Sequence, residues 1–212
     1  MPDAVALTDY ALAAVTAVLG LALIRGGRDA LPVRLWGLAF LALAAAGALA
    51  GFWHAHEHDH DAATLAWIWR VHEWGIALFG VGVVAGAARA AFSGRVLRIT
   101  LMLAALVALA FVVWTWNQPQ FRYVVVLDIL IMATVLTIHL ARLRREPATP
   151  WIVAGIATSA VAAGFQASNF SIFGLHHNAV FHLIQLAAML LLFAGARRLR
   201  GGPSTFPPGL PK

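Results

Sequence analysis

Histidines are the residues best suited to chemistry in this chain. Eight of the nine fall within two stretches, 54–72 and 176–182, and the chain has no cysteine. Imidazole and carboxylate are the usual zinc ligands where thiolates are absent, and a catalytic zinc keeps three protein ligands and one water. The pattern therefore predicts a zinc site with four candidate ligands: His54, His72, His177 and His182. For His72, a packing histidine bonded to a backbone carbonyl is an equal alternative.

Two carboxylates are candidates for the acid–base group that such a site needs. Zinc lowers the pKa of its bound water, and a nearby carboxylate can then take or give the proton. Glu73 and Asp128 are predicted to lie about two helical turns below the surface that carries the histidines. Arg70 could pair with Glu73, stabilise an oxyanion or bind an acidic headgroup.

Three polar residues mark one face of the last apolar segment. Asn178, His182 and Gln185 follow i, i+4, i+7 spacing, which places them on the same side of a helix. We expect Asn178 and Gln185 to flank His182 and to support it. His177 lies five residues before His182, so it could contribute only if the helix begins at or after it.

The segment 54–61, HAHEHDHD, alternates imidazole with carboxylate. Short histidine-rich tracts often capture metal, although a solvated polar loop is an equal interpretation. His54 differs from the other histidines because the residues 51–53 anchor it to the end of a predicted helix. We therefore assign His54 to the buried site and expect His56, His58 and His60 in an exposed loop.

The elements that would position these residues are long apolar segments. Hydrophobic residues make up 61% of the 212 residues and charged residues 11%, whereas a soluble domain carries about 25% charged residues. Seven stretches are long enough for transmembrane helices of about 20 residues: 4–24, 31–53, 64–92, 96–116, 120–141, 150–171 and 177–197. We predict an all-α, polytopic seven-helix bundle over residues 1–200, embedded in the lipid bilayer, and a disordered tail over 201–212.

Basic residues predict an orientation. Thirteen of the fifteen lie at every second boundary between segments, within 25–34, 89–98, 142–145 and 197–212, as expected of cytoplasmic loops. The N-terminus should then be outside and the C-terminus in the cytoplasm; in a bacterium, this is an inner-membrane protein with a periplasmic N-terminus. The first basic residue, Arg25, follows the first apolar run, which favours a retained helix over a signal peptide. The net charge of +6 is spread between apolar segments, so no nucleic-acid partner is expected.

This layout resembles the CREST superfamily, which includes alkaline ceramidases and progestin/adipoQ receptors. The resemblance rests on a histidine ending the second segment, an acidic residue in the third, and the stretch 177–185, HNAVFHLIQ. It implies a membrane amidase whose zinc is held by one histidine of the second helix and two of the seventh, here His54 and His182, with Glu73 in the role of an aspartate. Two positions depart from the family: Ala50 replaces a serine, and Asn178 replaces the other histidine of the seventh helix.

These observations predict a zinc-dependent intramembrane hydrolase that cleaves an amide or ester bond of a lipid-like substrate in the outer half of the membrane. A metal-binding, sensing or transport protein that uses the histidine-rich loop is one alternative, although few polar residues mark a route to the inner side. A haem-binding redox protein is another, but facing histidines at both depths are missing. His139 is expected to reach the inner interface. The last alternative is a structural or scaffolding protein in which the polar groups only hold the helices together.

Overall fold

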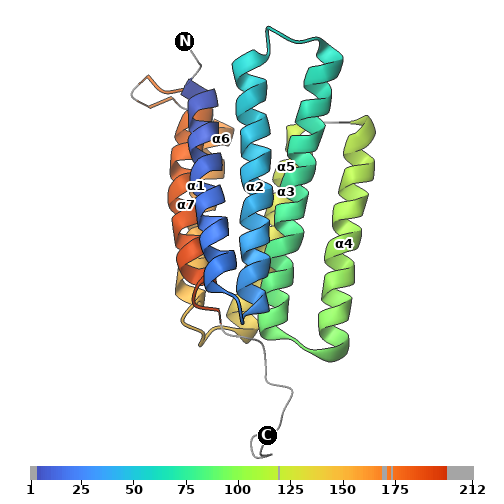
Figure 1. The fold of residues 1–212 in the computed structure, drawn as a ribbon, viewed down its shortest axis with the longest axis vertical. Helices are drawn as coiled ribbons and strands as arrows, with labels where there is room; N and C mark the ends of the chain where they lie inside the picture. The colour runs from blue at the N-terminus through green and yellow to red at the C-terminus, as the bar shows by residue number, and fades with distance from the viewer. Residues whose placement is uncertain (1–3, 119, 169–170, 173, 200–212) are drawn as a thin grey trace, which may run out of the picture.

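The computed structural model describes residues 4–118, 120–168, 171–172 and 174–199. Its helices are α1 (Ala4–Gly26), α2 (Leu31–His56), α3 (Ala62–Ala91), α4 (Gly94–Asn117), α5 (Phe121–Arg142), α6 (Thr149–Ser168) and α7 (His177–Ala196). They run up and down the long axis of the molecule (Figure 1). The predicted all-α bundle of seven helices is confirmed, and each helix end lies within three residues of its predicted position. The predicted tail 201–212 lies outside the described residues.

All seven helices are long and apolar enough to cross a membrane. Large hydrophobic side chains point outward from the bundle at many levels, and five of them are 63% to 66% exposed: Val18, Leu78, Met102, Val113 and Ile129. Extended exposed apolar surface of this kind marks contact with a membrane or a partner. The architecture is therefore compatible with a multi-pass membrane protein.

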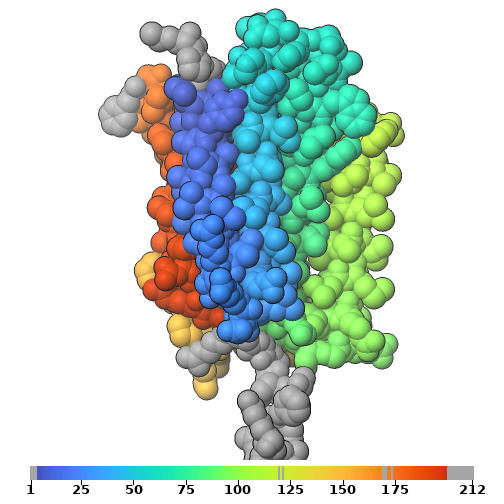
Figure 2. Space-filling view, viewed as in Figure 1, coloured from blue at the N-terminus to red at the C-terminus, as the bar shows by residue number. Residues whose placement is uncertain are grey.

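Six helices form a closed ring, and α4 lies outside it. Neighbours around the ring are α1–α2, α2–α3, α3–α5, α5–α6, α6–α7 and α7–α1, whereas α4 packs mainly on α3. Figure 2 shows α4 at the edge of the bundle. A cleft of about 270 Å³ lies between α3, α4 and α5 and is lined by apolar residues such as Gly80, Leu103 and Leu130. α4 contributes no side chain to the cluster on α1, α2 and α7 described below.

Small residues let α2 and α3 approach closely. A Cβ atom added at Gly75 would lie 2.8 Å from Ala46 Cβ, and one added at Gly82 would lie 2.6 Å from Ala39 Cβ. Close backbone approach through small residues is the usual way in which membrane helices pack. The contact brings the α3 side chain of His72 within reach of the α2 backbone.

The connection between α2 and α3 is shorter than expected. α2 continues through His56, so the prediction that the exposed loop begins after His54 is wrong: the helix carries His54 and His56, and the connection begins at Glu57. Asp61 ends the connection by capping α3, where its Oδ1 accepts hydrogen bonds from the Ala63 and Thr64 amides at 2.9 Å. The Thr64 amide hydrogen bond holds the pKa of Asp61 below its usual value.

Candidate functional site

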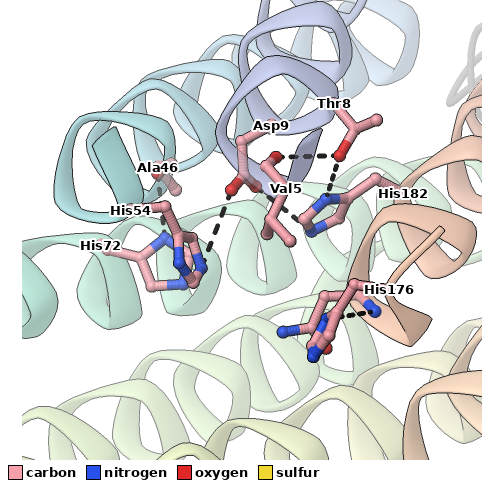
Figure 3. Close-up of polar contacts among 9 residues, drawn as sticks. Val5, Thr8, Asp9, Ala46, His54, His72, His176 and His182 are labelled. Carbon is pink, nitrogen blue, oxygen red and sulfur yellow. Dashed lines mark hydrogen bonds and ion pairs between the residues drawn. The ribbon is translucent and has the colours of Figure 1, made fainter. Parts of the chain in front are cut away.

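Side chains of α1, α2 and α7 meet at the end of the bundle where α1 begins. Asp9 of α1 lies between two imidazoles (Figure 3): His182 Nε2 is 3.2 Å from Asp9 Oδ1, and His54 Nε2 is 4.0 Å from Asp9 Oδ2. Asp9 and His182 are buried, whereas the His54 side chain is 21% exposed. We call Asp9, His54 and His182 the Asp9 cluster; its solvent access is at His54.

Thr8 binds the Nδ1 nitrogen of His182. Thr8 Oγ1 donates a hydrogen bond to Val5 O at 2.8 Å and lies 3.0 Å from His182 Nδ1. With its hydroxyl proton on Val5 O, Thr8 accepts from His182 Nδ1–H. In the neutral ring, His182 Nε2 then carries a lone pair, and this lone pair faces the Asp9 carboxylate.

His72 of α3 presents a third imidazole beside His54 (Figure 3). Its Nδ1 lies 2.9 Å from Ala46 O of α2, and because a carbonyl oxygen can only accept, Nδ1 carries the proton. Nε2 of the neutral ring therefore carries the lone pair.

With Nδ1 of His182 protonated, the Asp9 cluster has room for a cation between its members. In that tautomer the Nε2 lone pair and the carboxylate oxygen, 3.2 Å apart, repel each other unless a proton or a metal ion lies between them. Asp9 Oδ2 is buried and has no hydrogen-bond partner among the described residues. Either an extra proton or a metal ion bound by both oxygens would satisfy this carboxylate. The arrangement can therefore serve proton transfer or metal binding.

The distances allow a test of the metal interpretation. Within the described residues, no three His, Asp or Glu side chains are grouped closely enough to hold a metal ion as they stand. Tetrahedral zinc with ligand distances of about 2.0–2.1 Å places its ligand atoms roughly 3.3 Å apart. The Asp9–His182 separation already fits this value, and the 4.0 Å separation of Asp9 and His54 exceeds it by less than an ångström. His54 must therefore move before the three side chains could share one ion.

The three predicted catalytic residues do not belong to the Asp9 cluster. Glu73 is fully buried on α3, where its Oε1 accepts a hydrogen bond from Trp69 Nε1 at 3.1 Å. Asp128 lies on α5, and α5 does not contact α1, α2 or α7. Arg70 Nε donates to Trp116 O at 3.1 Å, so this guanidinium binds a carbonyl in the last turn of α4, as basic side chains often do at a helix C-terminus.

The other predicted residues of α7 lie toward its start. α7 begins at His177, which satisfies the condition for that residue, but its ring packs on His176 at 4.0 Å. His176 caps the helix, since its Nδ1 accepts from the Asn178 amide at 3.3 Å. Asn178 and Gln185 are half-buried. Among the described residues, none of these side chains hydrogen-bonds to the Asp9 cluster.

At the opposite end of the bundle, the prediction for His139 is wrong. The side chain does not reach the inner interface but is fully buried, with Nδ1 3.0 Å from Thr149 Oγ1 of α6. Thr149 donates its own proton to Leu143 O, so His139 Nδ1 is the donor. This pair joins α5 to α6.

Sequence reasoning missed Thr8 and Asp9. Asp9 follows five apolar or small residues in a segment that is otherwise suited to lipid, and a carboxylate inside such a segment normally faces the protein interior and has a function. That signal was available in the first helix.

Comparison with known proteins places the chain in a family whose function is unknown. No curated protein and no solved structure matches the chain. The family model that matches covers residues 4–201, and so includes all seven helices and every member of the Asp9 cluster. The chain therefore belongs to DUF6962, a family of unknown function.

Proposed function

We propose that this protein is a metal-dependent membrane hydrolase, with Asp9, His54 and His182 as the ligands of a zinc ion. The observation that carries the proposal is the pairing of Asp9 with His182 Nε2 at 3.2 Å, in a ring whose Nδ1 is bound by Thr8. Metal-bound histidines characteristically donate their other ring N–H to a carbonyl, carboxylate or water. Here Thr8 takes that role, so the histidine is oriented before any ion binds.

The ligand set fits zinc chemistry. Two imidazoles and one carboxylate leave the fourth tetrahedral position for water, as in catalytic zinc sites. A zinc ion lowers the pKa of a bound water to about 7 and polarises a carbonyl. His54 is the ligand nearest solvent, so a substrate would approach the open position from the end of the bundle where α1 begins.

We assign proton transfer to His72 in preference to Glu73 and Asp128. His72 is fixed by Ala46 O with its Nε2 free of a proton, beside His54. Glu73 is bound to Trp69 on a fully buried part of α3, and Asp128 lies across the ring. A neutral imidazole within reach of the reacting water is a suitable general base near neutral pH.

The surroundings of the cluster favour a lipid-like substrate. The helices that carry it have apolar outer surfaces and are long enough to cross a membrane, so a substrate with an acyl chain can reach it from the bilayer. An amide or ester bond at headgroup level would lie near the cluster. The resemblance to the CREST superfamily supports the same chemistry, although Asp9 is a ligand on the first helix that this resemblance does not supply.

We infer that the Asp9 cluster faces the outer side of the membrane, which is the periplasm in a bacterium. The cluster is at the bundle end where α1 begins, and the arginine-rich connections α1–α2, α3–α4 and α5–α6 are at the other end. Such connections are normally cytoplasmic. Alkaline phosphatase fused within the α2–α3 connection should be active and green fluorescent protein fused there should be dark; the reverse result would refute this orientation.

Metal analysis tests the proposed function. Purified full-length protein should retain about one zinc per chain after dialysis, and Asp9→Asn and His54→Ala should each lose it, together with hydrolysis of fluorogenic N-acyl amides or acyl esters in mixed micelles. His58→Gln is the matched control, because its exposed side chain contacts Glu57 and not Asp9. Bound haem in place of zinc, or full zinc content in Asp9→Asn, would reject the proposal. Absence of any tight metal in the wild type would identify the Asp9–His182 pair as a proton-binding site.

A further inference from the structure

A second group of histidines lies on the surface at the end of α2. His56 is the last residue of the helix, and His60 follows four residues later. Both imidazoles stack on the ring of Phe52, at centroid distances of 4.4 Å and 5.5 Å and interplanar angles of 20° and 23°. The shared phenyl ring therefore holds the two imidazoles on the same side of the chain.

The geometry of His56 is that of a metal ligand. Its Nδ1 lies 3.0 Å from Phe52 O, so Nδ1 carries the proton and Nε2 of the neutral ring carries the lone pair. The His56 and His60 centroids are 6.1 Å apart. Two imidazoles that bind one ion through Nε2 at about 2.0–2.1 Å have centroids roughly 5–6 Å apart, so a small rotation of either ring suffices.

The charge of this segment attracts cations. Residues 54–61 contain Glu57, Asp59 and Asp61 and no lysine or arginine. Carboxylates gathered on a surface raise the local concentration of cations and their association rate. Imidazole ligands in turn select transition metals over magnesium or calcium. The segment is therefore suited to capturing a divalent transition metal from dilute solution.

The surface pair and the Asp9 cluster share the last turn of α2. His54 and His56 are two residues apart, so their side chains leave the helix in nearly opposite directions at its end, and His54 is the most exposed member of the cluster. We propose that His56 and His60 form a surface site for a divalent transition metal ion and pass this ion to His54, which loads the Asp9 cluster. The loading step rests on the proposed function, since it requires a metal at the cluster.

The rate of metal loading tests this proposal. Tag-free, full-length protein is stripped with EDTA and mixed with zinc below one equivalent; aliquots are quenched with EDTA, and the zinc that resists the quench is counted over time. We expect the double variant His56→Gln/His60→Gln to load about 10-fold more slowly, because capture concentrates the ion, and to reach the same final content. His58→Gln, in the same segment, should load at the wild-type rate.

The outcomes separate the two proposals. Resistant zinc that forms equally fast in the double variant overturns the loading site and leaves the proposed function intact. Equal slowing in His58→Gln also overturns it, since the effect would then come from any histidine of the segment and not from the stacked pair. Absence of resistant zinc in the wild type rejects the proposed function, and the loading step fails with it.

Discussion

Both ends of the bundle contain a buried histidine held by a threonine. At one end Thr8 accepts from His182 Nδ1, and at the other Thr149 accepts from His139 Nδ1; each threonine donates its proton to a carbonyl oxygen. The difference lies at the other ring nitrogen. His182 Nε2 faces Asp9 at 3.2 Å, whereas His139 Nε2 has no hydrogen-bond partner among the described residues.

This comparison shows that a buried histidine is not by itself a functional site. The threonine fixes the ring orientation and the position of its proton at both ends, so that feature is compatible with helix packing alone. The carboxylate distinguishes the two ends, because it supplies a charge that a cation must balance. Asp9, more than any histidine, makes one end a candidate for chemistry.

Removal of each imidazole gives the largest expected contrast. His182→Ala should weaken zinc binding by more than about 100-fold, because a direct ligand is lost, whereas His139→Ala should keep the wild-type zinc content. Isothermal titration of the stripped variants measures both. If His139→Ala loses zinc to the same extent, the two ends are not functionally distinct.

Removal of each threonine hydroxyl should give a smaller difference, which affects zinc binding at one end of the bundle and stability at the other. Thr8→Val should weaken zinc binding by about 10- to 100-fold, since it releases the orientation of His182. Thr149→Val should leave zinc binding unchanged and lower the free energy of unfolding by about 1–3 kcal/mol, because the buried His139 N–H loses its acceptor. Zinc titration together with denaturing-detergent unfolding separates the effects, and a zinc defect in Thr149→Val would contradict the assignment.

The smallest effect concerns Asp61, an exposed carboxylate that contrasts with buried Asp9. Its folded-state pKa is lowered, chiefly by the Thr64 amide, so its stabilisation of α3 is present above the unfolded value of about 3.9 and is lost as the pH falls through the folded value. Asp61→Ala should therefore lower the thermal midpoint at neutral pH. The difference from wild type should fade as the pH falls through the folded-state value; a difference that persists after Asp61 is protonated would show that capping is not responsible.

The sequence predicted the helices because lipid imposes a simple rule. Every span needs roughly 20 apolar residues, and Gly, Pro and arginine interrupt the runs between spans. The end of α2 was misplaced because His54 and His56 are polar, yet the helical hydrogen bonds continue beneath them. Polarity marks where the chain leaves lipid, and a helix can extend beyond that point.

The candidate site was predicted only in part. His54 and His182 could be identified because imidazole is rare in apolar helices, and the structure joins them through a single carboxylate. Glu73 and Asp128 were plausible by depth, but depth does not give the direction of a side chain around its helix. Which faces converge depends on the closed ring of six helices and on the position of α4 outside it, and neither follows from hydropathy.

The peripheral position of α4 has a consequence for how this chain is made. Its buried residues are Leu97, Phe111 and Thr115, and most of its other side chains are exposed. In a membrane, lipid alone could therefore hold α4 during synthesis, before the ring has closed. α1 carries Asp9 and must wait for α2 and α7 to cover that carboxylate, so it is made before both of them and reaches its final environment only after them.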